Sequence, residues 1–525
     1  MTETTGQRAG RREWLGLAVL MLPTLLIAMD FTVLHLAVPH LTADLAPSSA
    51  QLLWIVDIYG FLIAGSLITM GTLGDRIGRR RLLLVGAAAF GLASILAAFS
   101  PSAEALIAAR ALLGVAGATL MPSTMSLLRT MFPDPQQFTV AIGVWVSGFS
   151  AGSALGPLLG GWMLEHFWWG SVFLLNVPVM VALLVLGPIL LPEYRNPEPG
   201  RFDLLSAGQS LATVLLVIFG VKRLAEAGLG WVPLLSIAAG AVVGVLFLRR
   251  QRTLPDPLLD LGLFANRAFS TSVGTMTLGI FAFLGANFFI AQYLQLVLGL
   301  SLLEAGLWTL PGAIAFIVSS NLAPRLVRWL RPVVVVTIGW ALAAVGFAIL
   351  ARVGADGLPV LVAANVILPL GFGLVVTLVV EMILGAAPPE RAGAASALSE
   401  TSQELGGALG IAVLGSIGTA VYRSEVTEAL PAGLSPEAAE GARDTLGGAV
   451  AAAAGLPDPL GGALLAVTRD AFVQGLQLTA VISAAVLAGI AVLVLAVLRQ
   501  PPAGGEPEAP VPTPSEPVFD AACAD

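Results

Sequence analysis

The sequence has very little charge for its length. Of its 525 residues, 11% are charged and 57% are apolar, and the mean hydropathy is +0.89. A soluble globular protein carries about 25% charged residues, which cover its surface in water. A water-soluble enzyme of this size is therefore excluded, and the high apolar content excludes disorder for most of the chain.

Residues that carry chemistry are also scarce. The lone cysteine, Cys523, excludes an intrachain disulfide, and three scattered histidines form no metal-ligand cluster, so we expect neither a metal nor a cofactor. Lys222 is the only lysine, and no G-x-x-x-x-G-K-[ST] loop is present, which argues against direct coupling to ATP. The net charge of −7 argues against nucleic acid as a partner. We do not expect an enzyme.

What the sequence has in abundance is long apolar runs. A run of about 20 apolar residues is long enough to cross a bilayer as a helix. Fourteen such runs predict an all-α membrane protein, at 14–38, 51–73, 81–100, 104–126, 138–163, 169–191, 204–221, 231–248, 268–296, 303–324, 332–351, 358–384, 397–421 and 476–498. The first run is not a cleavable signal, because it is about 25 residues long and contains Asp30.

Basic residues predict the orientation. With the N-terminus inside, 19 of the 26 Lys and Arg residues fall in inner segments, as the positive-inside rule requires. Both termini, 1–13 and 499–525, are therefore expected in the cytoplasm. The tail after Arg499 holds seven prolines and is expected to be disordered. The outer loop 422–475 is unusually long, and helix-like stretches near 436–453 and 461–472 predict a small extracellular helical hairpin.

The segment 71–81 carries the first specific motif. It reads Gly-Thr-Leu-Gly-Asp-Arg-Ile-Gly-Arg-Arg-Arg, with glycines where two helix ends turn and arginines at the inner face. This resembles the loop G-x-L-a-D-r-x-G-r-r between the second and third helices of the major facilitator superfamily. The resemblance implies two six-helix halves and a gating latch formed by Gly71, Asp75, Arg76, Gly78 and Arg79. The matching segment of the second half, 324–331, keeps the arginines and lacks the aspartate.

A stripe of glycines marks the fifth span. Gly148 and three further glycines recur at every fourth residue and so share one helix face, where another helix can approach closely. A proline in this stretch removes a backbone hydrogen bond and should bend the helix. The pattern resembles the motif of proton-coupled exporters in the superfamily, carried here by Gly152, Gly156, Pro157, Gly160 and Gly161.

Fourteen spans resemble the drug:proton antiporter branch of the family, which has two extra central helices. The resemblance implies a 6+2+6 arrangement, with six-helix bundles at 14–191 and 268–498 and two linker helices at 204–248. The stretch 29–39, Met-Asp-Phe-Thr-Val-Leu-His-Leu-Ala-Val-Pro, is similar to the branch signature L-D-x-T-v-v-n-v-A-l-P.

Three charges in the first half are expected at similar depth in the membrane. Asp30 lies nine residues before Pro39, and Asp57 and Arg110 each lie six residues after the outer start of their spans. Because buried charge is costly in a bilayer, each must face a cavity or a partner. An acid that pairs with Arg110 could be merely structural, a role that suits Asp57 better than Asp30. We expect Asp30 or Asp57 to exchange a proton for a cationic substrate, because proton and cation compete for one negative charge.

The second half contributes further acidic candidates. Glu381 lies near the inner end of the twelfth span, and Glu400 and Glu404 share one face at the start of the thirteenth. For these a substrate or proton site and a merely solvated helix end remain open. Aromatic residues that can stack on a flat cation are Phe31, Tyr59, Phe289, Tyr293 and Trp308.

These features together predict a secondary transporter of a bacterial cytoplasmic membrane. The favoured function is proton-coupled export of lipophilic, cationic drugs such as quaternary ammonium compounds and dyes, by a monomer in the lipid bilayer. An exporter dedicated to one antibiotic or metabolite is the nearest alternative. A membrane sensor or scaffold leaves Asp30 and Asp57 unexplained, and an uptake symporter leaves the glycine stripe unexplained.

Overall fold

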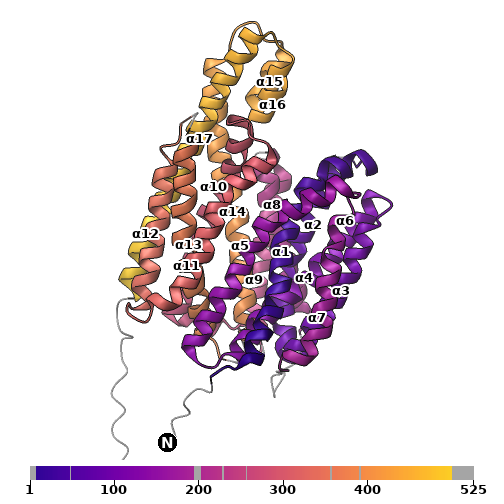
Figure 1. Cartoon of the computed structure of the whole chain (residues 1–525), viewed down its shortest axis with the longest axis vertical. Coiled ribbons are helices and arrows are strands. Elements are labelled where there is room, and N and C mark those ends of the chain that lie inside the picture. The colour runs from indigo at the N-terminus through magenta and orange to yellow at the C-terminus, as the bar shows by residue number, and fades with distance from the viewer. Residues whose placement is uncertain are drawn as a thin grey trace, which may run out of the picture.

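The protein is a bundle of long helices. The computed structural model describes residues 8–47, 49–193, 203–227, 230–255, 257–354, 357–388 and 392–498, and every regular element within these ranges is helical (Figure 1). This described part contains fourteen helical spans long and apolar enough to cross a membrane. The predicted all-α fold with fourteen spans is confirmed. Such a fold suits a membrane because each helix satisfies its backbone hydrogen bonds internally.

The N-terminal half forms six spans from seven helices. Its helices are α1 (Arg11–Leu45), α2 (Ser49–Ile77), α3 (Arg79–Ala98), α4 (Ala103–Met131), α5 (Pro135–His166), α6 (Ser171–Leu174) and α7 (Asn176–Leu190). The short α6 and α7 follow one another and together make the sixth span. Within this half α1 packs on α5 and α7, α4 packs on α2 and α3, and α3 packs on α7.

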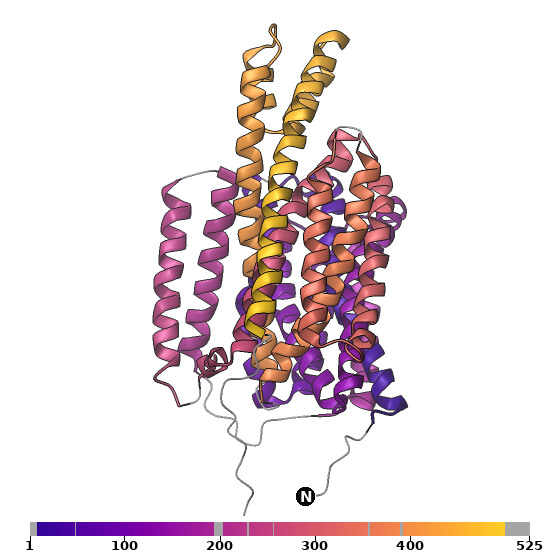
Figure 2. The ribbon, with the colours of Figure 1, turned by 90° about the vertical axis from the view of Figure 1, so that its left-hand side faces the viewer.

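Two helices lie between the halves in the chain. They are α8 (Leu204–Ala227) and α9 (Trp231–Gln251), which pack on each other as an antiparallel pair. Figure 2 shows this pair beside the main bundle. A connector at 257–266, which includes a short 3-10 helix, then leads into the C-terminal half.

The C-terminal half carries the second set of spans. Its helices are α10 (Arg267–Gln292), a π-helical turn (Tyr293–Val297), α11 (Leu302–Leu326), α12 (Pro332–Leu350), α13 (Leu358–Ala386), α14 (Ala392–Ala429), α15 (Pro436–Asp444), α16 (Leu446–Ala454) and α17 (Asp458–Leu498). Here α13 packs on α11 and α12, α10 packs on α14, and α17 packs on α10, α12 and α14.

Helices α14 and α17 project well beyond the other helices and carry α15 and α16 at their tip (Figures 1 and 2). The expected loop 422–475 is therefore shorter than predicted, since α14 continues to Ala429 and α17 begins at Asp458. The stretch 461–472 is the first part of α17 and not a separate helix. Pro459 stands in the first turn of α17, where proline favours the start of a helix, and no proline interrupts the helix from there to Leu498.

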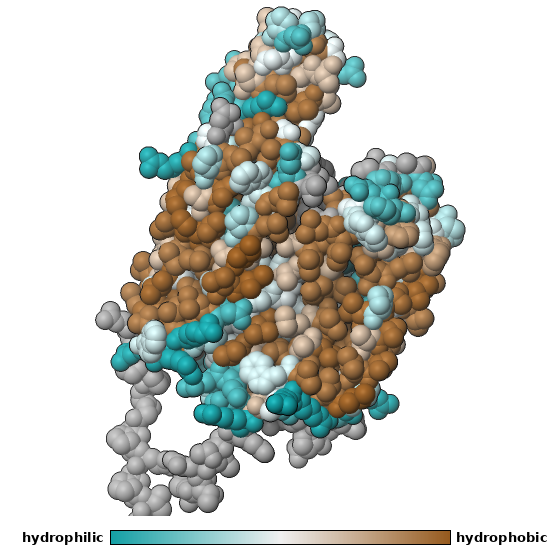
Figure 3. Space-filling model, viewed as in Figure 1, coloured by the Kyte–Doolittle hydropathy of each residue, from teal (hydrophilic) through white to brown (hydrophobic). Residues whose placement is uncertain are grey.

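The molecule has two distinct ends. We call the end where the described chain begins the lower face and the end that carries α15 and α16 the upper face (Figure 1). An even number of spans places both ends of the described chain at the lower face. Figure 3 shows a broad apolar belt between polar residues at the lower face and at the tip. This belt is the surface that faces lipid.

The two halves meet along two seams. Helix α2 packs on α14, and α5 packs on α11 and α13. Hydrogen bonds across these seams, such as that from Ser150 to the Ala313 carbonyl and that from Ala394 to Asp75, lie at mid-height or nearer the lower face. At the upper face a notch separates the base of the projecting helices from the N-terminal half (Figure 3). The structure is thus closed at the lower face.

Candidate functional site

A buried ion pair lies inside the N-terminal half. The Arg110 guanidinium of α4 donates to the Asp30 carboxylate of α1 over 2.7 Å, and the two side chains belong to residues that are only 1% and 7% exposed. Arg110 also donates to the backbone carbonyls of Ile55 (3.0 Å) and Val56 (3.3 Å) on α2. A buried charge pair of this kind requires such additional hydrogen bonds to offset desolvation. One guanidinium therefore joins α1, α2 and α4.

Aromatic rings enclose this pair. The guanidinium carbon of Arg110 lies 4.6 Å from the ring centre of Tyr59 on α2 and 6.0 Å from that of Phe173 on α6. Cation–π contact in a desolvated site adds to the stability of the pair. A small cavity beside Asp30 is lined by Met29, Val33 and Leu34 of α1 and by Val172, Phe173, Leu175 and Asn176. The site thus combines an ionisable pair with adjoining empty space.

The partner of Arg110 is Asp30, which corrects the sequence prediction that favoured Asp57. Asp57 is half-buried on α2. Depth in the membrane alone does not distinguish the two acids, because which of them reaches Arg110 depends on how α1 and α2 are rotated about their axes. Sequence spacing brings both acids to the right height but gives no rotation of one helix relative to another.

The acids of the C-terminal half lie across the α2–α14 seam. Glu400 and Glu404 are half-buried, one turn apart on α14, and their charges interact. Glu404 is also close enough to Tyr59 for its charge to act on the phenol. Glu381 of α13 is half-buried near Thr139 of α5, on the other seam. The structure therefore brings Glu404 towards the Asp30–Arg110 pair but places Glu381 elsewhere.

The glycine stripe of α5 faces α1. Gly148 lies opposite Met21, Gly152 opposite the Leu25 carbonyl, and Gly160 opposite Val33. Gly156 is also buried, whereas Gly161 has open space around it. Helix α5 continues through position 157, and the Pro157 side chain lies outside the described residues. The stripe thus holds α5 against the helix that carries Asp30.

The predicted latch lies at the lower end of α2. Arg79, which is 1% exposed, donates from Nε to Asp75 over 2.9 Å and from Nη1 to the Ser126 carbonyl over 3.1 Å. The other Asp75 oxygen accepts from the backbone N–H of Ala394 over 3.2 Å, in the first turn of α14. A carboxylate is favoured at a helix N-terminus. Asp75 thus connects the N-terminal half to the C-terminal half.

Two positions of the latch require glycine, each for a different steric reason. A Cβ on Gly71 would lie 2.5 Å from the Gly393 carbonyl, so only glycine lets α2 and α14 approach this closely. Gly78 has φ +113°, a value that favours glycine, and it forms the turn from α2 to α3. Arg76 is half-buried in the last turn of α2. The motif therefore shapes a close helix crossing as well as an ion pair.

We expect Asp75→Asn to open the lower face. The substitution weakens the acceptor for Ala394 and leaves Arg79 buried without its carboxylate, so the open population should rise about tenfold. Labelling of an engineered lower-face cysteine in a Cys523→Ser background measures this. The control is Glu193→Gln, which breaks the more exposed 3.4 Å pair with Arg80 nearby. Equal labelling of both variants and the parent would contradict the latch.

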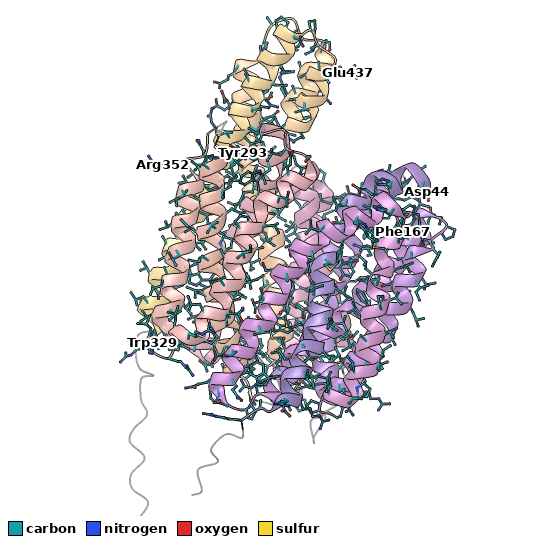
Figure 4. All side chains as sticks on the ribbon, viewed as in Figure 1. Asp44, Phe167, Tyr293, Trp329, Arg352 and Glu437 are labelled. Atoms are coloured by element: carbon teal, nitrogen blue, oxygen red, sulfur yellow. The ribbon has the colours of Figure 1, made fainter. Side chains whose placement is uncertain are left out.

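Most of the aromatic candidates pack in the protein interior. Tyr59 lies under Arg110, and Phe289 packs against Phe288 and Phe472. Tyr293 donates to the Gly354 carbonyl over 2.6 Å and lies at the base of the projecting helices (Figure 4). Trp308 is 41% exposed, and the Phe31 side chain lies outside the described residues. Phe289 and Tyr293 are buried in the upper part of the C-terminal half, and contact between these aromatic rings and substrate stays a prediction.

A polar cluster that the sequence patterns did not predict lies on the α5–α11 seam. Ser147 of α5 shares a 2.9 Å hydrogen bond with Ser320 of α11 and accepts from Asn321 over 2.7 Å. Small hydroxyl side chains are common in membrane helices, where they also bond their own backbone, so they give little signal in a sequence. Asn321 in an apolar span is the signal that could have indicated this contact.

Two helical halves that meet around buried charges, with a latch at one face, define a membrane transporter that works by the movement of one half against the other. A profile of the Major Facilitator Superfamily matches residues 20–411. The chain belongs to this superfamily.

Related proteins agree with this assignment. The chain is 48% identical over 494 residues to the multidrug efflux pump LfrA of Mycolicibacterium smegmatis, which covers 94% of this chain and 98% of LfrA. It is 37% identical over 449 residues to the methyl viologen resistance protein SmvA of Salmonella typhimurium, covering 84% and 89% of the two chains. The crystal structure of the human organic anion transporter MFSD10 shares the fold, with a TM-score of 0.58, 17% identity, and coverage of 90% of this chain and 99% of that one.

Proposed function

We propose that this protein exports lipophilic cationic drugs across a bacterial cytoplasmic membrane in exchange for protons. The observation that carries the proposal is the buried Asp30–Arg110 pair with Glu404 on the opposing half. The relatives named above, a multidrug efflux pump and a methyl viologen resistance protein, support export as the direction and small toxic compounds as the cargo. The arginine-rich lower face is then cytoplasmic.

The exchange follows from the charge of the pair. With Asp30 ionised, Asp30 and Arg110 together are neutral; with Asp30 protonated, the pair carries a net positive charge. Two unit charges about 10 Å apart repel by about 1.7 kcal/mol at an effective dielectric constant near 20. A proton on Asp30 therefore disfavours a cation held by Glu404, and a bound cation disfavours the proton. This mutual exclusion is the basis of antiport.

Alternating access sets the direction in which the cation and the proton move. The structure is closed at the lower face, so a cation held at Glu404 is released through the upper face and a proton enters from the same side. When Asp30 has accepted the proton, the lower face opens and the proton leaves to the cytoplasm. The latch at Asp75 and the seam at Ser147 must break in that step.

The experiment measures proton release from purified protein when substrate is added. We expect release with lipophilic cations and none with neutral or anionic compounds of similar size. Release with a single compound only would indicate a dedicated exporter, and absence of release alongside transport would exclude proton coupling.

A substitution that removes the charge of Glu404 tests whether the cation binds there. We expect Glu404→Gln to raise the Kd for cations about tenfold, because one partly desolvated charge contact is lost. The control is Glu428→Gln, the same change on the same helix at an exposed position above the bundle. Unchanged cation affinity in Glu404→Gln would remove Glu404 from the proposed site.

A further inference from the structure

The connector between α9 and α10 is fastened by one buried side chain. Gln251, the last residue of α9, is 3% exposed. Its Oε1 accepts from the backbone N–H groups of Leu258 (2.8 Å) and Leu259 (3.3 Å), and its Nε2 donates to Ser206 of α8 over 2.8 Å. Gln251 thus ties the connector to the lower ends of both linker helices.

An acidic residue completes this junction. Asp203, just before α8, accepts from Ser206 Oγ over 2.7 Å and from Arg250 Nε over 2.7 Å. The hydrogen bond from Arg250, followed by that from Ser206, holds the pKa of Asp203 well below its usual range. Asp203 therefore stays ionised at physiological pH, and the start of α8, the end of α9 and the connector form one unit.

This unit touches the latch. The hydroxyl of Thr72 shares its proton between two carbonyl oxygens, that of Ile68 in its own helix at 2.9 Å and that of Leu258 in the connector at 3.3 Å, and both Thr72 and Leu258 are buried. Thr72 follows Gly71 and precedes Asp75 by less than one helical turn, so the stretch of α2 that holds α14 also holds the connector. The connector leads directly into α10 of the C-terminal half. The Thr72–Leu258 bond therefore links the two halves at the lower face.

The same helix pair also covers the seam at mid-height. Helix α8 packs on both α2 and α14. Ile218 of α8 forms a cluster with Phe61 and Ala64 of α2, and Ala408 of α14 packs against that cluster. The next residue of α8, Phe219, stacks on Trp54 of α2, with ring centres 6.1 Å apart. The pair thus spans the α2–α14 seam from its upper part down to the latch.

We infer that α8 and α9 act as a brace that stabilises the conformation closed at the lower face, and that Gln251 is its positioning residue. Gln251 sets the connector so that the Leu258 carbonyl meets Thr72. When α2 and α14 part at the lower face, this hydrogen bond is lost. The two helices that extend the twelve-helix arrangement thus have a role in gating. Its effect on drug transport rests on the proposed function, whereas its effect on conformation does not.

The test measures the distance between the halves at the lower face. Spin labels at Arg81→Cys on α3 and Trp329→Cys after α11, in a Cys523→Ser background, report opening as a longer distance; Figure 4 marks Trp329 at the lower face, and it is 86% exposed. We expect Gln251→Ala to raise the lower-face-open population about fivefold relative to the parent, since positioned hydrogen bonds are lost. Thr72→Val should give a similar shift.

A double variant separates gating from general destabilisation. If Gln251 acts through Thr72, then Gln251→Ala combined with Thr72→Val shifts the population no further than either alone. The matched control is Ser236→Ala, which removes a 3.1 Å hydrogen bond from α9 to the Leu216 carbonyl of α8, away from the connector, and should leave the distance unchanged.

Additive shifts, an equal shift in Ser236→Ala, or no shift in Gln251→Ala would each overturn the brace. Should Gln251→Ala fold poorly, Thr72→Val against Ser236→Ala gives the same comparison. Failure of drug-induced proton release in the parent protein, with the distance shifts intact, would remove the proposed function and leave the brace standing.

Discussion

We expect Asp30→Asn to abolish proton-driven efflux while the protein remains in the membrane. Asparagine keeps the shape of the side chain but holds neither the negative charge nor the exchangeable proton. Transport in proteoliposomes under an imposed pH gradient should fall to background. Normal transport by this variant would remove Asp30 from the coupling mechanism.

The variant carries a stability cost that needs its own control. Loss of the carboxylate leaves Arg110 buried and unpaired with a charge, which costs about 3–5 kcal/mol. The double variant Asp30→Asn/Arg110→Gln removes that unpaired charge and should recover the thermal stability without recovering transport. Recovery of both thermal stability and transport in the double variant would show that the pair is structural. An Asp30→Asn variant that loses stability but still transports would lead to the same conclusion.

The second large effect is expected from a single methyl group. Gly152→Ala would place a Cβ against the backbone carbonyl of Leu25 on α1, in contact with Ala28 as well. Backbone cannot move aside as a flexible side chain can, so α5 must shift away from α1, the helix that carries Asp30. We expect transport to be lost, or reduced at least about a hundredfold, in the same proteoliposome assay.

Gly161→Ala is the matched control, since it makes the same change in the same helix and motif. Gly161 has no atom within 4 Å of the position that a Cβ would take. Transport by this variant should equal that of the parent. If both alanine variants lose transport, the glycines matter for flexibility of α5 and not for its approach to α1.

The number of spans could be predicted because each depends only on local sequence. A run of about 20 apolar residues that forms its own backbone hydrogen bonds is stable in a bilayer without any knowledge of its neighbours. The latch residues could also be located, because Gly71 to Arg79 are contiguous in the chain. The ends of α14 and α17 could not, because they extend beyond the lipid and are fixed by packing on each other and on α16.

Contacts between helices were harder to predict from the sequence. Asp30, not Asp57, pairs with Arg110, and Tyr293 donates a hydrogen bond to the backbone carbonyl of Gly354. Each outcome depends on the rotation of one helix against another, which hydropathy does not encode when most faces of a helix are apolar. The junction at Gln251 was not predicted either, since its partners come from two other segments of the chain, the start of α8 and the connector.

The sequence by itself determined that the chain is a fourteen-span membrane protein, which face carries the arginines, and which few charges stand inside the membrane. Composition and periodicity suffice for this, because the cost of burying a charge is a property of the residue and the solvent. Only the tertiary structure decided which charges meet, that Gly152 faces α1, and that the linker helices reach the latch through Leu258. Those facts depend on distances between atoms far apart in the chain, and they follow only once the helices are packed.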